Sequence, residues 1–168
     1  MNGYAVMNID AALDQLEVLL PARHTMIVTI ESCTGGGIAQ AITSRSGSSV
    51  WFDRSWVTYS NAAKHEMVGV SQADLDGHGA VSEQVALAMV RGAVDRCQGQ
   101  RLAISVTGIA GPGGGSVDKP VGLVYLAWKL NEKEVVERQL LDGDREQIRT
   151  RTIVRALQGA VELLNHPD

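Results

Sequence analysis

Residues 26–37 read MIVTIESCTGGG, and this stretch decides the class of the fold. Its first five residues form a short apolar run of the kind that builds a buried strand. The run stops at Glu31-Ser32-Cys33-Thr34 and three glycines, and a helix-compatible stretch follows over residues 38–43. The sequence therefore predicts a strand that turns directly into a helix, with Ser32 on the turn between them.

The segments on either side repeat this alternation of strands and helices. Apolar residues at helical spacing predict an opening helix from Ile9 to Leu20, which Pro21 ends. Residues 56–59 are expected to form a strand, followed by a short helix that Asn61 caps and that carries Lys64. Further strands are expected over residues 102–107, 121–128 and 135–141, and further helices over residues 82–95 and from 144 to the end. Because a tight turn joins the last two strands, we expect an α/β fold with a mixed sheet.

Size and composition favour one soluble globular domain. The chain has 168 residues, 45% hydrophobic and 20% charged, so we expect a single domain over residues 1–168. The net charge is −4 and no basic run occurs, which argues against nucleic-acid binding. No apolar stretch is long enough to span a bilayer and the first residues lack the pattern of a secretory signal. We therefore expect no membrane association and a cytoplasmic location.

The cysteines and histidines lack the spacing of a metal site. Cys33 and Cys97 are expected to be free thiols, and Cys33 is expected to pack in the interior because its side chain points away from that of Ser32 on an extended strand end. The four histidines, at positions 24, 65, 78 and 166, are expected to be polar surface or loop residues. No metal is therefore expected.

Ser32 is a candidate nucleophile because small residues surround it on the predicted turn. The glycines after Thr34 leave backbone amides free to point at a phosphate or at the oxyanion of an attacked carbonyl group. A serine hydroxyl still needs a neighbouring base to remove its proton. The alternative is that Ser32 only caps the helix and that the glycines only allow close packing.

Lys64 is the candidate base, since it follows a predicted strand end. A lysine acts as a base only where burial or nearby positive charge lowers its pKa from about 10.4 towards neutrality. Tyr59 can relay a proton or position the lysine. The alternative is that Lys64 is a surface residue and Tyr59 a core residue, which is the commoner situation for an isolated lysine in a helical first turn.

The glycine-rich segment over residues 107–115 is the third candidate. Its backbone amides can wrap a phosphate or a ribose, and the alternative is a mobile surface loop. Lys119 and Arg145 are candidate partners for an anion. An arginine in the first turn of a terminal helix is, however, usually a solvated charge.

These segments resemble blocks of the CinA C-terminal domain family, and they occur in the family's order over nearly the whole chain. The matching blocks are ESCTGG at 31–36, VTYSNAAK at 57–64, HGAVS at 78–82, the segment 107–115 with KPVG at 119–122, and GDR at 143–145. The enzymatic members of this family are nicotinamide-nucleotide amidases. Many members carry a further N-terminal domain similar to molybdopterin-binding proteins, and functions tied to that domain are not expected here.

The resemblance implies a three-layer α/β/α domain that hydrolyses the carboxamide of nicotinamide mononucleotide to nicotinate mononucleotide and ammonia, in pyridine nucleotide salvage. It makes Ser32 the expected nucleophile, Lys64 its base and Tyr59 a supporting catalytic residue. The expected substrate-binding residues are Thr34, Gly35, Gly36, Asn61, Thr107, Gly108, Gly111, Gly113, Gly114 and, on the phosphate side, Arg145. This chemistry requires no cofactor.

Two alternatives to this enzyme remain open at the level of sequence. A non-catalytic nucleotide-binding or partner-binding module would use the same glycine loops while Lys64 stays protonated. An amidase for another small amide would keep Ser32 essential but leave nicotinamide mononucleotide untouched. We also expect a homo-oligomer, because Trp51, Phe52 and Trp56 cluster in one segment, unless that cluster belongs to the core.

Overall fold

The expected mixed sheet forms the centre of the computed structural model, which describes residues 8–166. Its strands are β1 (Met26–Glu31), β2 (Phe52–Val57), β3 (Arg101–Gly108), β4 (Leu123–Leu130) and β5 (Lys133–Leu140). They lie in the order β2-β1-β3-β4-β5. β1 pairs in parallel with β2 and β3, whereas β4 is antiparallel to both β3 and β5. The expectation of a mixed sheet is confirmed.

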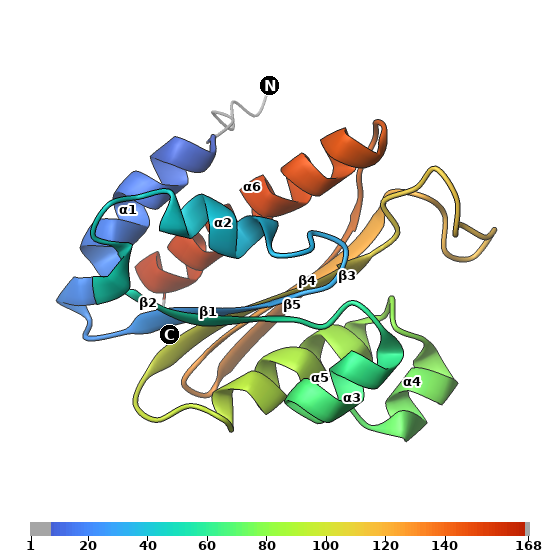
Figure 1. Cartoon of the computed structure of the whole chain (residues 1–168), viewed down its shortest axis with the longest axis horizontal. Coiled ribbons are helices and arrows are strands. Elements are labelled where there is room, and N and C mark those ends of the chain that lie inside the picture. The colour runs from blue at the N-terminus through green and yellow to red at the C-terminus, as the bar shows by residue number, and fades with distance from the viewer. Residues whose placement is uncertain (1–7, 167–168) are drawn as a thin grey trace.

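Helices cover both faces of this sheet, as Figure 1 shows. One face carries α1 (Ile9–Ala22), α2 (Gly37–Thr43) and α6 (Arg145–Asn165), and the other carries α3 (Asn61–Val68), α4 (Gln72–His78) and α5 (Glu83–Val94). A short 3₁₀ helix (Ser48–Val50) precedes β2. The three-layer α/β/α architecture is therefore confirmed. No helix within residues 8–166 is long and apolar enough to cross a membrane.

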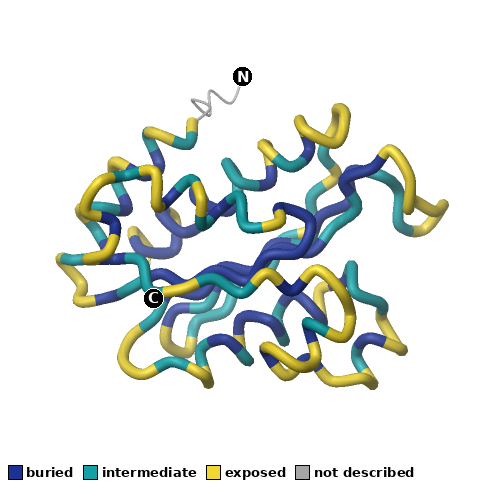
Figure 2. Tube along the Cα trace, viewed as in Figure 1, coloured by how far each residue is buried: buried dark blue, intermediate teal, exposed yellow. Residues whose placement is uncertain are grey.

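Strand alternation divides the core into two apolar clusters. Ile27 and Ile104 face the layer of α1, α2 and α6, whereas Val28, Ile30 and Ala103 face the layer of α5. Figure 2 shows the central strands β1, β3 and β4 buried between the helices, whereas the edge strands β2 and β5 are half-buried or exposed. Because successive side chains of a strand point to opposite faces, the same alternation decides which layer each residue at the end of β1 meets.

Several local expectations were wrong. The last two strands cover residues 123–130 and 133–140 rather than 121–128 and 135–141. The second strand covers residues 52–57 rather than 56–59, because its pairing with β1 ends where Val57 meets Glu31. The cap of α3 is Ser60, whose Oγ accepts from the N–H of Ala63 at 3.0 Å, and Asn61 is the first helical residue. Pro21 lies inside the last turn of α1 instead of ending it.

The aromatic cluster near β2 belongs to the interior. Trp51 is 3% exposed and lies in the cluster beneath α1 and α6, against which Phe52 also packs. Trp56 packs against the opposite cluster, beneath α5. Trp51 is a core residue, and the half-buried Phe52 and Trp56 pack against the two clusters on opposite faces of the sheet, so the three side chains do not form the single exposed patch from which an oligomer was expected.

The parallel strands bring the candidate segments to one edge of the sheet. Ser32 directly follows β1, Thr58 follows β2, and Gly108 ends β3. The carboxyl ends of neighbouring parallel strands lie together, and loops gather ligands there. The glycine-rich segment leaves the same end of β3, so the three sequence candidates meet in space.

Candidate active site

Ser32 lies on the same side of the sheet as α3. Val28 and Ile30 face the α5 layer. Ser32 is two residues after Ile30, so on the extended end of β1 it faces the same layer. Its N–H donates to the carbonyl oxygen of Val106 at 3.1 Å, which ties the turn to β3. The serine is 8% exposed, so its hydroxyl is shielded from bulk water but still borders a cavity.

Lys64 reaches this serine from the first half of α3. Its Nζ donates to Ser32 Oγ at 3.0 Å, to the carbonyl oxygen of Thr58 at 2.7 Å and to that of Tyr59 at 3.4 Å. The residue is 1% exposed and none of these partners is a carboxylate. Burial therefore lowers the pKa of Lys64 from 10.5 to about 8. An amine with this pKa is neutral in a larger fraction of molecules near neutral pH than an ordinary lysine, and its neutral form can accept the proton of Ser32.

The turn after Ser32 offers free amide donors. Gly35 and Gly36 have φ values of 59° and 95°, a region that favours glycine. Among the described residues, the N–H groups of Cys33 and Thr34 donate to no backbone carbonyl oxygen, whereas the neighbouring N–H of Gly35 donates to Ser32 O at 3.0 Å. Unpaired amides next to a nucleophile can stabilise the oxyanion of an attacked carbonyl group.

A cavity of about 240 Å³ opens over the Ser32–Lys64 pair. Its lining residues are Ser32, Cys33, Tyr59, Lys64, Ala80, Val81, Thr107, Gly108, Ala110 and Arg145. Nη1 of Arg145 donates to the carbonyl oxygen of Gly111 at 2.9 Å, and Nη2 donates to Tyr59 Oη at 3.4 Å. A buried serine hydroxyl, a buried lysine and an arginine thus line the same cavity.

Arg145 also borders a second cavity, of about 450 Å³. This cavity shares Ala110 and Arg145 with the first one and is otherwise lined by Pro112, Val121, Gly143, Asp144 and Glu146. The arginine therefore stands where the two cavities meet. A ligand longer than one ring can reach both of them.

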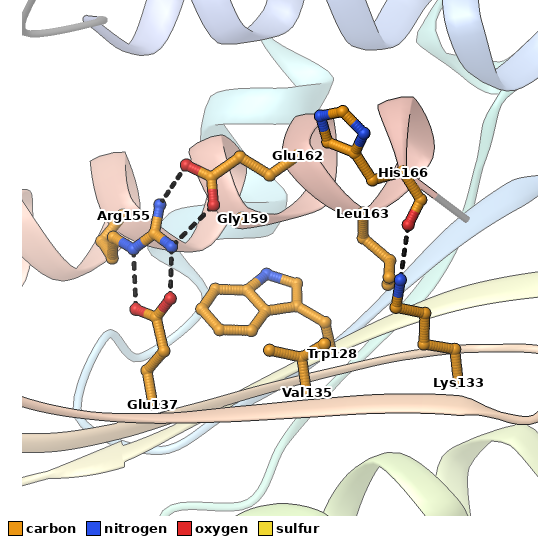
Figure 3. A pocket seen from close by; sticks show the side chains of 9 residues that line it. All are labelled: Trp128, Lys133, Val135, Glu137, Arg155, Gly159, Glu162, Leu163 and His166. Carbon is orange, nitrogen blue, oxygen red and sulfur yellow. Dashed lines mark hydrogen bonds and ion pairs between the residues drawn. The ribbon is translucent and has the colours of Figure 1, made fainter. Parts of the chain in front are cut away.

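A third cavity, of about 180 Å³, lies near the carboxyl end of α6 and carries no such chemistry. Figure 3 shows Arg155 ion-paired with Glu137 and Glu162 above the indole of Trp128. The residues that line it include no serine, threonine or cysteine. Among these three cavities, the one that contains Ser32 is therefore the only one lined by a serine, threonine or cysteine.

The structure brings six of the predicted site residues together in one cavity and leaves the others outside its lining. The six are Ser32, Tyr59, Lys64, Thr107, Gly108 and Arg145. Thr34 is fully buried, and its hydroxyl donates to Glu31 at 2.6 Å instead of facing the cavity. Gly111 offers its carbonyl oxygen to Arg145. The remaining residues do not line this cavity and are exposed or half-buried: Gly35, Gly36, Asn61, Gly113 and Gly114.

Sequence reasoning gave no site role to Cys33, Ala80 or Val81, which also line the cavity. Burial raises the pKa of the Cys33 thiol to about 11, so the thiol stays protonated near neutral pH, whereas the Ser32 hydroxyl contacts a candidate base, Lys64, at 3.0 Å. Ala80 and Val81 precede the cap of α5, and their only sequence signal was the matched block at residues 78–82. Within residues 8–166, no group of three or more acidic, histidine or cysteine side chains is placed to hold a metal ion.

Comparisons with known proteins agree on one family. The family model described as CinA C-terminal domain matches residues 10–164. The nicotinamide-nucleotide amidohydrolase PncC of Pseudomonas putida is 50% identical over 140 residues, which is 83% of this chain and 87% of that protein. The protein of the same name from Escherichia coli strain K12 is 45% identical over 146 residues, covering 86% and 88%. The solved structure of competence/damage inducible protein CihA from Agrobacterium tumefaciens has a TM-score of 0.89 at 43% identity, covering 94% of this chain and 95% of its own.

Proposed function

Because the chain belongs to the CinA C-terminal domain family, we propose that it is a nicotinamide-nucleotide amidohydrolase. It converts nicotinamide mononucleotide and water to nicotinate mononucleotide and ammonia. Relatives of 45–50% identity carry this activity in their names. The observation that carries the catalytic assignment is the 3.0 Å contact between Lys64 Nζ and Ser32 Oγ beneath a cavity.

The acylation step uses Ser32 as nucleophile and Lys64 as base. Neutral Lys64 takes the hydroxyl proton while Ser32 Oγ forms a bond to the carboxamide carbon. The C–N bond then breaks, and the ammonium group of Lys64 gives its proton to the departing nitrogen, so ammonia leaves. The product of this step is an ester between Ser32 and the nicotinoyl group.

Hydrolysis of the ester repeats the cycle with water. Lys64 removes a proton from a water molecule, the resulting oxygen bonds to the ester carbon, and Ser32 Oγ leaves with the proton that Lys64 returns. In both steps, negative charge develops on the former carbonyl oxygen. The N–H groups of Cys33 and Thr34, which donate to no backbone carbonyl oxygen within the described residues, are the proposed donors to that oxygen.

The remaining site residues are proposed to hold the nucleotide. Arg145 pairs with the phosphate, which its place between the two cavities supports, and Tyr59 helps to hold Arg145 through their 3.4 Å contact. Thr107 and Gly108 form the wall of the reactive cavity. The glycines of the loop after β3 are proposed to reach the ribose or phosphate when substrate binds.

The experiment that tests this substrate is a panel of carboxamides with the purified chain. We expect ammonia and nicotinate mononucleotide in a one-to-one ratio from nicotinamide mononucleotide, and much slower release from free nicotinamide, which lacks the phosphate for Arg145. Release from a different amide only would favour the second amidase hypothesis. Saturable binding of the nucleotide without any ammonia would favour the non-catalytic module and contradict the proposal.

We also propose an oligomeric state and a location in the cell. A homo-oligomer is supported by β2, an edge strand beside which Val57 and Tyr59 are 43% and 62% exposed. Light scattering that reports a monomer would contradict the homo-oligomer.

A cytoplasmic location is supported by the charge of the substrate, since a phosphorylated nucleotide does not cross a bilayer freely. Cell fractionation tests the location.

A further inference from the structure

Glu31, the residue before the proposed nucleophile, has a fully buried carboxylate with unusual partners. Its Oε1 accepts from Thr34 Oγ1 at 2.6 Å and from the N–H of Ile38 at 2.8 Å. Its Oε2 accepts from the N–H of Ala39 at 3.0 Å and from Ser55 Oγ at 3.3 Å. No cation pairs with this carboxylate within the described part of the chain, so these hydrogen bonds offset the cost of burying its charge.

These bonds make Glu31 the cap of α2. Gly36 occupies the N-cap position of this helix and has no side chain to satisfy the first amides. The carboxylate of Glu31 takes two of them and places a negative charge at the helix N-terminus, where it is favoured. The strand end before Ser32 is thereby tied to the helix start after it, and the turn between them is closed.

Arg149 holds the opposite, carbonyl side of the same turn. From α6, its Nε donates to the carbonyl oxygen of Cys33 at 3.2 Å, and its Nη2 donates to that of Thr34 at 3.1 Å. In a trans peptide the C=O and the following N–H point in opposite directions. A guanidinium that fixes the carbonyl of Cys33 therefore also fixes the direction of the N–H of Thr34.

The result is a turn whose three carbonyl oxygens are occupied. Ser32 O accepts from Gly35 N–H, and Cys33 O accepts from Arg149. Thr34 O accepts from both Arg149 and Gly37 N–H. Within residues 8–166, the N–H groups of Cys33 and Thr34 donate to no backbone carbonyl oxygen. Such a turn can bind a developing oxyanion through its N–H groups, because its carbonyl oxygens already accept from other donors.

We propose that Glu31 and Arg149 are positioning residues that set the place of Ser32 and the direction of its neighbouring amides. Neither side chain lines the reactive cavity, so neither touches the substrate in this account. They act through the backbone of the turn. The inference rests on the proposed role of Ser32 as nucleophile.

The test compares Glu31→Gln and Arg149→Met with the matched controls Glu137→Gln and Arg151→Met. Glu137 accepts from Arg155, which lies at the middle of α6. Arg151 is a neighbour of Arg149 on α6 and donates to the backbone carbonyl oxygen of Asp142. Circular dichroism first selects the variants that fold, and Arg149→Lys adds a milder variant with a single donor centre. The main readout is the rate at which a small fluorophosphonate modifies Ser32, followed by intact mass, and kcat and KM for nicotinamide mononucleotide are measured beside it.

We expect both positioning variants to slow the labelling of Ser32 and kcat by about tenfold or more, since small misplacements of reacting groups are costly. KM should change by less than about threefold, and the pH dependence of labelling should keep its midpoint because Lys64 is intact. Both controls should stay within about twofold of the native rates.

Three outcomes contradict parts of this account and can be told apart. Folded Glu31→Gln and Arg149→Met chains that are labelled as fast as the native chain overturn the positioning role, and so does a rise in KM with unchanged labelling. A native chain that labels but does not hydrolyse the nucleotide overturns only the substrate, and the labelling comparison still decides the inference. A native chain that does not label at Ser32 contradicts the nucleophile assignment and this inference with it.

Discussion

At the scale of single residues, the site depends on a lysine that is buried without a counter-charge. Three oxygens surround Lys64 Nζ, two of them carbonyl oxygens and one the hydroxyl of Ser32. None of them compensates a full positive charge, and burial lowers the pKa of the amine to about 8. The same burial that supports the proposed role of Lys64 as base makes its protonated form costly for the fold.

The first prediction concerns the pH profile of the reaction. Because only neutral Lys64 can accept the proton of Ser32, kcat/KM should rise with pH and level off above the lysine's pKa of about 8. Steady-state kinetics from about pH 6 to about pH 9.5 measures this. A flat profile across that range would contradict the role of Lys64 as base.

The second prediction concerns stability and has the same cause. Unfolding returns the pKa of Lys64 from about 8 to 10.5, so the unfolded chain holds more protons than the folded chain between these values. The folded state therefore gains stability as pH rises through this window. Relative to Lys64→Met, the native chain should gain about 2 kcal/mol in unfolding free energy between about pH 7 and about pH 9.5. Urea denaturation of both chains at the two pH values measures these unfolding free energies. If the unfolding free energies of the two chains changed equally with pH, the prediction would be wrong.

Sequence reasoning reached Ser32 and Lys64 but gave no role to Glu31 and Arg149. The first pair follows strand ends, a position that can be predicted locally. Arg149 acts 116 residues away in sequence from Cys33, and nothing local marks it. Glu31 sits in an apolar strand, where a carboxylate is unexpected, and this was the one signal that could have drawn attention to it.

At the scale of elements, the two short helices α3 and α4 offer a matched pair of caps. Ser60 Oγ accepts from Ala63 N–H and Ser71 Oγ accepts from Asp74 N–H, each at 3.0 Å. Only α3 carries a proposed catalytic residue. The effect of a cap on stability can therefore be separated from its effect on activity.

The third prediction compares Ser60→Ala with Ser71→Ala. Both should lose about 1 kcal/mol of unfolding free energy, because each removes one cap hydrogen bond. Only Ser60→Ala should lower kcat, by about threefold or more, because a frayed first turn of α3 moves Lys64. Thermal unfolding and ammonia release measure the two effects. Equal activities in the two variants would show that the α3 cap does not position the base.

The strand and helix types could be predicted from sequence better than their ends. Hydrophobic periodicity identified α1, α5 and α6, since their apolar faces are long. The bounds of β2 depend on its pairing with β1, which no local pattern encodes. α4 was missed because it spans seven residues and buries only Leu75.

At the scale of the whole molecule, α6 connects the reactive edge of the sheet to its opposite end. Its first residue, Arg145, borders the site, and Gly159 packs against Trp128 near its other end. A Cβ at position 159 would lie 2.2 Å from the indole, so glycine is required for this close approach. Packing at that end should matter for stability and not for the chemistry.

The fourth prediction is a pair of glycine substitutions with opposite effects. Gly159→Ala should destabilise the fold by about 1–3 kcal/mol through overpacking against Trp128. Gly77→Ala, in α4, meets nothing within 4 Å and should be neutral or raise stability by up to about 1 kcal/mol through helix propensity. Both variants should keep the native kcat/KM. Destabilisation by Gly77→Ala, or loss of activity in a folded Gly159→Ala chain, would contradict this picture.

We propose that residues 1–168 form a single domain. Both apolar clusters pack on one continuous sheet, which supports one cooperative unit. Denaturation followed by tryptophan fluorescence and by far-ultraviolet circular dichroism should then give coincident transitions. Separate midpoints would indicate two units.

We propose above that Ser32 carries the acyl group during amide hydrolysis. The rate of ammonia release by serine-to-alanine variants tests this role. Ser32→Ala is compared with Ser48→Ala, which removes another buried serine hydroxyl in the 3₁₀ helix before β2. The account predicts that Ser32→Ala lowers kcat for ammonia release from nicotinamide mononucleotide by at least about a thousandfold. It predicts that Ser48→Ala stays within about twofold of the native rate. A folded Ser32→Ala chain that still releases ammonia at a rate close to the native one would contradict it.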